Sequence, residues 1–196
     1  MTEFLPVTLT AHPMTDDEFA EFCSDHPDLF FEISAEGEII VMAGAYTLTG
    51  VRNAMISAHL DAWARLDRRG ITAGSSTGFV LPNGARRSPD ASWTLKSRIE
   101  QLDAVTLEKF LHLCPDFVVE LKSAPDVSQT IHKKMKEYLA NGAQLGWLID
   151  FEARTVSIYR PDREVETLGN VESMTGDGPV AGFVLDLRPV WDPLAD

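Results

Sequence analysis

Two charged residues, Glu120 and Lys122, stand in an otherwise apolar stretch of the sequence, residues 117–122. In a β-strand, alternate side chains point to opposite faces, so Glu120, Lys122 and Val118 are expected to share one face. A charged group that is buried without a partner costs much free energy, and a divalent cation is a natural partner for such a pair. The stretch therefore predicts a buried strand that carries an acid and a base side by side.

A second carboxylate precedes this stretch by thirty residues, in the segment Ser88-Pro89-Asp90. Asp90 and Glu120 on adjacent strands, together with a backbone carbonyl such as that of Leu121, would form an oxygen-rich site of the kind that magnesium or manganese prefers. Lys122 could then position or activate a water molecule, or offset negative charge on a phosphate. The chemistry predicted is the hydrolysis of a phosphodiester.

Each of these motifs also has an ordinary structural interpretation. Pro-Asp is a common turn pair, so Asp90 could be an ordinary turn residue without a catalytic role. Glu120 and Lys122 could form a salt bridge on an exposed edge strand, where such a pair contributes little to stability. The combination of an apolar strand, an E-x-K pair and a helix directly after it favours the catalytic interpretation.

The helix expected directly after the strand extends over residues 127–141. It is predicted by an apolar stripe at helical spacing, which consists of Val127, Ile131, Met135 and Tyr138. Lys134 falls at the edge of the stripe, whereas Lys133 and Lys136 point away from it. Lys134 could therefore reach the rim of the site. The alternative is an ordinary lysine whose aliphatic stem lies along apolar surface.

Strand and helix patterns alternate along the rest of the chain, which predicts the α/β class with a mixed central β-sheet flanked by helices. Helices are expected over residues 15–24, with Thr15 as the cap, over 50–69, and over 95–113 with a break near Asp103. Strands are expected over 29–34, 38–43, 71–82 (as two short strands or one interrupted by a bend), 87–94 with an irregularity at Pro89, 144–150, 156–161 and 183–187. The length predicts a single domain, 1–196, with an N-terminal helix and hairpin (1–45), a core (46–161) and a β-rich tail (162–196).

Composition excludes several classes of protein. Cys23 and Cys114 are far apart and have no CxxC partner, so neither a disulfide framework nor a zinc knuckle is expected. The sequence contains no GxxxxGK[ST] loop, no GxSxG elbow and no HExxH pair, which argues against nucleoside triphosphatases, serine hydrolases and zinc proteases. Because neither a signal peptide nor a long apolar run is found, a cytoplasmic protein with no membrane association is expected.

The net charge of −13 disfavours a general affinity for nucleic acid, because such affinity depends on lysine and arginine displacing counterions from phosphates. A metal-dependent phosphodiesterase still fits this charge, since it needs carboxylates at its centre and only a local basic rim around them. The charge therefore leaves the substrate open.

Several segments resemble the Uma-two family of bacterial proteins, which belongs to the restriction-endonuclease-like PD-(D/E)XK superfamily. The similar segments extend over nearly the whole chain and include SPDASW at 88–93, CPDFVVELKS at 114–123, GAQLGWLID at 142–150 and GFVLDL at 182–187. The resemblance implies a mixed four-stranded core sheet flanked by helices. It also implies Asp90 and Glu120 as ligands of Mg²⁺ or Mn²⁺, and Lys122 as the catalytic lysine.

The N-terminal part of the resemblance adds Glu32 as a further acid, although a glutamate near a strand end is more often solvated. The implied substrate is nucleic acid, most naturally DNA, and the fold often cuts duplexes as a homodimer. Fold alone does not establish activity, so the endonuclease assignment here is what the resemblance implies.

Three functional hypotheses follow. The first is a metal-dependent endonuclease that hydrolyses nucleic-acid phosphodiester bonds. The alternative is a catalytically silent nuclease-fold module that binds a protein partner, for which the negative charge and the apolar C-terminal segment around Val190 and Trp191 give some support. A hydrolase of small phosphoesters cannot be separated from the first hypothesis by sequence.

Overall fold

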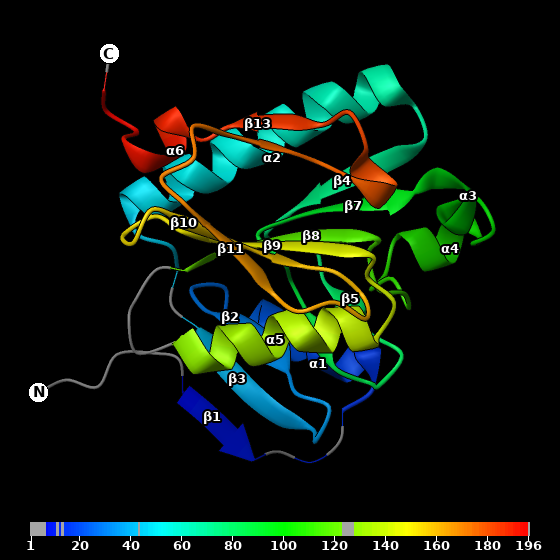
Figure 1. Ribbon diagram of the computed structural model, residues 1–196. Helices are drawn as coiled ribbons and strands as arrows, with labels where there is room; N and C mark the ends of the chain where they lie inside the picture. Colours follow the sequence, from blue (N-terminus) through cyan, green and yellow to red (C-terminus); the bar gives the residue numbers. More distant parts are fainter. Residues whose placement is uncertain (1–6, 11, 13, 43, 123–127, 196) are drawn as a thin grey trace, which may run out of the picture.

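The computed structural model describes the chain except for residues 1–6, 11, 13, 43, 123–127 and 196. Its centre is a six-stranded sheet in the order β11-β10-β9-β8-β7-β4 (Figure 1). These strands are β4 (Gly70–Gly74), β7 (Ala91–Leu95), β8 (Phe117–Lys122), β9 (Leu145–Asp150), β10 (Thr155–Tyr159) and β11 (Glu166–Gly169). Since β8 and β9 are parallel and the other neighbours are antiparallel, the sheet is mixed, as predicted.

The two central strands are buried on both faces, which explains their nearly continuous apolar sequences. One face packs against helix α2 (Thr47–Asp67), strands β12 (Ser173–Thr175) and β13 (Val184–Asp186), and helix α6 (Arg188–Trp191). The 3₁₀ helix η2 (Gly178–Val180) lies between β12 and β13. The other face packs against helix α5 (Ser128–Ala140), through Met135 and Tyr138 among others.

A second sheet, in the order β1-β3-β2-β6-β5, lies beside α5. Its strands are β1 (Val7–Thr10), β2 (Phe30–Ile33), β3 (Glu38–Met42), β5 (Phe79–Val80) and β6 (Arg86–Arg87). The predicted hairpin between β2 and β3 is present, and Gly37 has the positive φ of 86° that its turn requires. This sheet brings β2 and β6 to the same side of the central sheet as α5.

Helix α1 (Asp16–Asp25) begins as predicted. The Thr15 side chain accepts a hydrogen bond from the backbone of Glu18, and the Glu18 carboxylate accepts one from the backbone of Thr15. This capping box satisfies donors that the first turn of a helix leaves free. Arg86 and His112 both contact Asp16 and so attach α1 to the body of the molecule.

Two predictions of local structure need correction, and a third lies in part outside the described residues. The helical stretch expected over 95–113 is interrupted near Asp103, as predicted, but it forms only two single-turn helices, α3 (Lys96–Ile99) and α4 (Ala104–Leu107), with a turn at 100–103 and Asp103 as the cap of α4. The strand expected over 87–94 is divided at Pro89 into β6 and β7, which belong to different sheets. The start predicted at residue 127 for the helix now seen as α5 lies outside the described residues.

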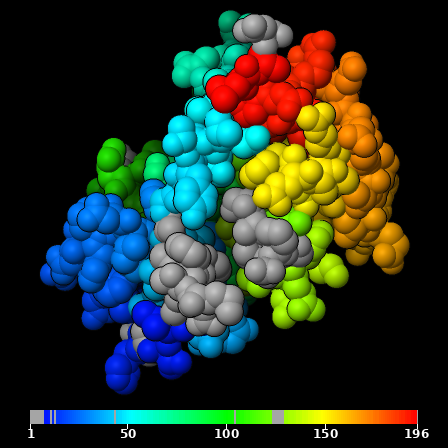
Figure 2. All heavy atoms as spheres, turned by 90° about the vertical axis from the view of Figure 1, so that its left-hand side faces the viewer, coloured from blue at the N-terminus to red at the C-terminus, as the bar shows by residue number. Residues whose placement is uncertain are grey.

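The C-terminal segment is also placed differently from the expectation of an exposed partner-binding surface. Val190 and Trp191 are 1% and 7% exposed, and the Trp191 indole N–H donates to the Val171 carbonyl at 2.9 Å. Figure 2 shows the C-terminal segment (red) next to the first turns of α2 (cyan) and the β9–β10 turn (yellow). Arg52 of α2 joins these parts, because it donates to the Val190 carbonyl at 2.8 Å and lies 4.0 Å above the Phe151 ring. Among the described residues, no helix is both long and apolar enough to cross a membrane.

Candidate active site

Asp90 and Glu120 come together where β7 and β8 pair. Ala91 is opposite Val119 in the antiparallel register, so Asp90, one residue before β7, reaches the level of Glu120. The Asp90 carboxylate is fixed through one of its oxygens, Oδ2, which accepts a hydrogen bond from the Leu121 backbone N–H at 2.7 Å. Asp90 and Glu120 therefore lie on adjacent strands, as expected. Leu121 contacts Asp90 through its backbone N–H, whereas the sequence suggested its carbonyl as a metal ligand.

Lys134 of α5 lies at the centre of the acidic residues. Its Nζ is 2.7 Å from Glu120 Oε1 and 2.8 Å from Glu32 Oε1, and only 13% of its side chain is exposed. The sequence placed Lys134 at the rim of the site with a solvated lysine as the alternative. The structure instead gives it two buried ion pairs that join β2, β8 and α5.

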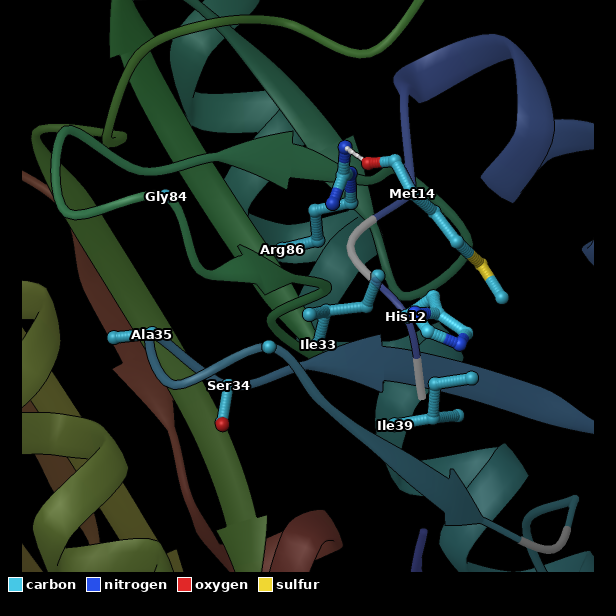
Figure 3. Close-up of a pocket in the computed structure, with 9 residues that line it drawn as sticks. His12, Met14, Ile33, Ser34, Ala35, Ile39, Gly84 and Arg86 are labelled. Carbon is cyan, nitrogen blue, oxygen red and sulfur yellow. Dashed lines mark hydrogen bonds between the residues drawn. The ribbon is translucent and has the colours of Figure 1, made fainter. Parts of the chain in front are cut away.

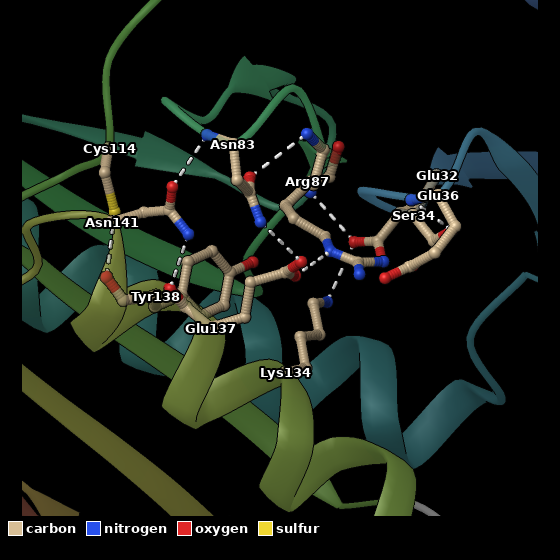
Figure 4. Close-up of polar contacts among 12 residues, drawn as sticks. Glu32, Ser34, Glu36, Asn83, Arg87, Cys114, Lys134, Glu137, Tyr138 and Asn141 are labelled. Atoms are coloured by element: carbon tan, nitrogen blue, oxygen red, sulfur yellow. Dashed lines mark hydrogen bonds and ion pairs between the residues drawn. The ribbon is translucent and has the colours of Figure 1, made fainter.

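Glu32 is buried, in contrast to the solvated position expected for a glutamate near a strand end. It is 2% exposed, and its Oε2 accepts from Arg87 Nη1 at 3.1 Å while Oε1 accepts from the Ser88 backbone N–H at 2.9 Å. The reason is that β2 pairs with β6, which brings Arg87 and Ser88 alongside Glu32. Figure 4 shows Glu32, Arg87, Glu137 and Lys134 facing one another across this interface.

The charges in this buried and half-buried cluster do not balance. Four carboxylates, those of Glu32, Asp90, Glu120 and Glu137, face two cations, Lys134 and Arg87, and the Arg87 Nε also contacts Glu137 at 2.6 Å. If every group is ionised, two negative charges remain without compensation. Uncompensated charge in a region of low dielectric favours either proton uptake or the binding of a cation.

The pKa values of two carboxylates follow this imbalance, whereas at Glu32 burial is outweighed by Lys134 and Arg87, which lower the pKa. Burial raises the pKa of Asp90, and the hydrogen bonds from Leu121 and Asn53 only partly oppose it. Burial, with Asp90 and Glu32 nearby, also raises the pKa of Glu120 even though Lys134 opposes the change. Burial acts in the opposite direction on Lys134, but Glu120 and Glu32 outweigh it, so the pKa of Lys134 is raised and the side chain stays a charged ammonium.

Lys122 makes a different contact from Lys134. It shares a face with Glu120 by strand alternation, as predicted, but its Nζ pairs with Asp150 Oδ2 on the neighbouring strand β9 at 2.5 Å. Within the described ranges, no ion pair joins Lys122 to Glu120 or Asp90. Of the predicted site residues, the structure thus brings together Asp90, Glu120, Glu32 and Lys134, and leaves Lys122 at one side.

Two residues that the sequence did not indicate complete the cluster. Asn53 of α2 donates through Nδ2 to Asp90 Oδ1 at 2.9 Å, and the Tyr138 hydroxyl of α5 donates to Glu120 Oε1 at 3.0 Å. A signal for Asn53 was available, because it precedes the buried residues Ile56 and Leu60 by three and seven positions and so lies on the inner face of its helix. Tyr138 was assigned to the apolar stripe alone, so its hydroxyl was overlooked.

The donor set fits a hard divalent cation. Asp90 and Glu120 offer carboxylate oxygens, and the buried Asn53 Oδ1 has no hydrogen-bond partner among the described residues. No group of three or more His, Cys, Asp or Glu side chains in the described part of the chain has the arrangement of a metal site. A cation here would therefore be held by two carboxylates together with neutral oxygens, and its charge would match the two surplus negative charges.

The cavity drawn in Figure 3 lies apart from these acids. It has a volume of about 160 Å³ between the N-terminal segment, the β2–β3 turn and the β5–β6 turn, and it is lined by His12, Ile33 and Arg86 among others. Arg86 closes one side by donating to the Met14 carbonyl at 2.9 Å. The cavity includes none of the clustered carboxylates, so the chemistry of the candidate site does not depend on it.

Comparisons with known proteins bear on the fold and on the family of the chain. A crystal structure described as "a putative nuclease belonging to DUF820", from Anabaena variabilis, has a TM-score of 0.73 and 24% sequence identity, and the alignment covers 91% of this chain and 98% of that chain. At this identity the likeness shows a shared fold, a mixed sheet flanked by helices. A search of curated proteins gave no match. The sequence profile of the Uma2 family, described as "Putative restriction endonuclease", matches residues 16–188, and the chain therefore belongs to the Uma2 family.

Proposed function

We propose that the chain is a divalent-metal-dependent endonuclease that hydrolyses phosphodiester bonds of nucleic acid. The observation that carries this proposal is the buried cluster in which Lys134 lies between Glu32 and Glu120 while Asp90 adjoins them with surplus negative charge. Membership of the family described as "Putative restriction endonuclease" supports the same reaction class. Mg²⁺ or Mn²⁺ is the proposed cofactor, because these ions prefer carboxylate and amide oxygens.

Asp90 and Glu120 are the proposed metal ligands. Both carboxylates are held before any cation arrives, Asp90 by the Leu121 N–H and Glu120 by Lys134 and Tyr138. Such fixed ligands lose little conformational freedom on binding, which favours affinity and a defined orientation. A bound cation would supply Lewis-acid stabilisation of the phosphate and lower the pKa of a bound water.

Lys134 is the proposed lysine of the reaction centre, in preference to Lys122. It contacts Glu120 directly, and its raised pKa makes it a hydrogen-bond donor and a fixed positive charge rather than a proton acceptor. An ammonium in this position can orient a water molecule or offset charge that develops on a phosphate oxygen. Lys122 is assigned to the ion pair with Asp150, which ties β8 to β9.

The substrate is proposed to be DNA, bound through local contacts rather than through the overall electrostatic field. The net charge of −13 opposes non-specific association, so affinity should be low and strongly dependent on salt. Measurable cleavage should therefore need low ionic strength or a preferred structure in the DNA.

Cleavage of supercoiled plasmid, linear duplex, single-stranded DNA and RNA, each with Mg²⁺, with Mn²⁺ and with EDTA, tests this proposal. We expect cleavage that requires the metal, is abolished in Glu120→Gln and Lys134→Met, and is retained within a few-fold in Lys122→Met. Folding of each variant is checked by circular dichroism. Metal-independent cleavage, or no cleavage of any of these substrates, would contradict the proposed function; loss in Lys122→Met with retention in Lys134→Met would reverse the assignment of the lysine.

A further inference from the structure

The side-chain amide of Asn53 uses its nitrogen but not its oxygen in hydrogen bonds within the described residues. Its Nδ2 donates to Asp90 Oδ1 at 2.9 Å, whereas its Oδ1 is buried and has no donor among the described residues. As an ionised metal ligand, Asp90 only accepts hydrogen bonds, so it faces the NH₂ group of Asn53. The unpartnered atom is thus the oxygen, and it belongs to the same side chain that holds a proposed metal ligand.

A buried amide oxygen without a donor is unusual. Buried polar atoms in folded proteins nearly always have a partner, and one that lacks a partner retains its full cost of desolvation. An apolar residue at this position of α2 would avoid that cost, since Ile56 and Leu60 on the same helix face pack into the core. The asparagine is therefore best explained by something that Oδ1 binds.

The surroundings select a cation as that partner. Asp90 accepts a hydrogen bond from the same amide, Glu120 lies opposite Asp90 in the β7–β8 register, and the cluster holds two more carboxylates than cations. An amide oxygen is a ligand that Mg²⁺ and Mn²⁺ accept beside carboxylates. It adds a third oxygen to the two acids without adding further negative charge.

We propose that Asn53 has two roles in this centre, as a positioning residue that orients Asp90 through Nδ2 and as a neutral oxygen ligand of the divalent cation through Oδ1. This inference rests on the proposed function, because it requires that Asp90 and Glu120 bind a metal ion. It extends the metal centre from β7 and β8 to helix α2, a third element.

Calorimetric titration of the full chain with MnCl₂ tests the inference without relying on catalysis. The variants are Asn53→Ala, which removes both amide groups, and Asn53→Asp, which keeps an oxygen at Oδ1 but loses the donor to Asp90. Asn141→Asp is the matched control, because Asn141 also uses its side chain in hydrogen bonds but contacts Asn83 and Glu137 instead of Asp90. Thermal unfolding in EDTA shows whether each variant folds.

We expect Asn53→Ala to weaken Mn²⁺ binding about 10–100-fold, the range seen when a residue that supports a metal site is removed. Asn53→Asp should bind Mn²⁺ more tightly than Asn53→Ala, yet melt at a lower temperature than the wild type in EDTA because it places a carboxylate against Asp90. Asn141→Asp should bind Mn²⁺ as the wild type does.

The outcomes separate this inference from the function on which it rests. If the wild type binds Mn²⁺ and Asn53→Ala binds it equally well, the role of Asn53 is refuted while the proposed metal dependence stands. If Asn53→Asp is as weak as Asn53→Ala, the oxygen is not a ligand and the second role fails. If the wild type itself binds no Mn²⁺, both the proposed function and this inference are overturned.

Discussion

Replacing Lys134 with methionine removes a buried positive charge and keeps most of the volume of the side chain. Lys134 is 13% exposed and contacts Glu120 at 2.7 Å and Glu32 at 2.8 Å. In the variant, Glu32 keeps Arg87 as a partner, whereas Glu120 keeps only neutral donors such as Tyr138. Removing one partner from a buried ion pair typically costs about 3–5 kcal/mol, and we expect a loss of that size in the free energy of unfolding at pH 8.

The loss of unfolding free energy in Lys134→Met should depend on pH if it comes from the missing charge, but not if it comes from altered packing. Near pH 5 Glu120 takes up a proton readily, since its pKa is already raised by burial, so the missing ammonium matters less there. Urea denaturation at pH 8 and pH 5 in EDTA measures both values. Lys133→Met is the control, because Lys133 is exposed on the same helix and should change stability by less than about 0.5 kcal/mol. An equal loss at both pH values, or a loss no larger than that of Lys133→Met, would refute the ion-pair argument.

Further predictions concern the pH dependence of stability, the packing of Gly70 against Trp93 and the N-terminal cap of helix α1. The pKa of Glu120 is raised from 4.5 to about 7, so between pH 4.5 and pH 7 the folded state holds a proton that the unfolded state has released. The free energy of unfolding without metal should therefore fall by about 3 kcal/mol over this pH range, relative to Glu120→Gln. Bound Mn²⁺ should reduce this fall. Denaturant titrations of both proteins from pH 4 to 8 measure this difference. Gly70→Ala would place a Cβ 2.1 Å from the ring of Trp93, so we expect a loss of about 1–3 kcal/mol in thermal or urea unfolding. Thr15→Ala should cost about 1 kcal/mol by the same measurement, and no change would mean that the capping box contributes nothing.

Much of the fold could be predicted because its strongest signals are local. The apolar strand 117–122, the β2–β3 hairpin and the cap at Thr15 all depend on residues close together in the sequence. Strand alternation also correctly predicted that Glu120 and Lys122 share a face. The adjacency of Asp90 to Glu120 came from the family resemblance combined with a chemical expectation, and the pairing of β7 with β8 provides its physical basis.

The remaining parts of the site depend on contacts between distant segments. Glu32 and Lys134 are 102 positions apart and meet only because the second sheet packs beside α5, which no periodicity within either segment encodes. Periodicity also cannot distinguish a lysine whose stem lies along the surface from one that enters a buried cluster, because both occupy the edge of an apolar stripe. For the same reason Lys122 could not be assigned to Asp150, since their pairing depends on the parallel register of β8 and β9.

The burial of the C-terminal segment has a consequence for how the protein folds during synthesis. Phe183, Leu185, Val190 and Trp191 belong to the same core as the central strands, and the buried Arg52 of α2 finds its acceptor in the Val190 carbonyl. A nascent chain that has emerged only as far as β10 therefore has one face of its sheet incompletely covered and an arginine without that partner. The domain can close only after residues 183–191 have left the ribosome, so its folding should follow the synthesis of that segment.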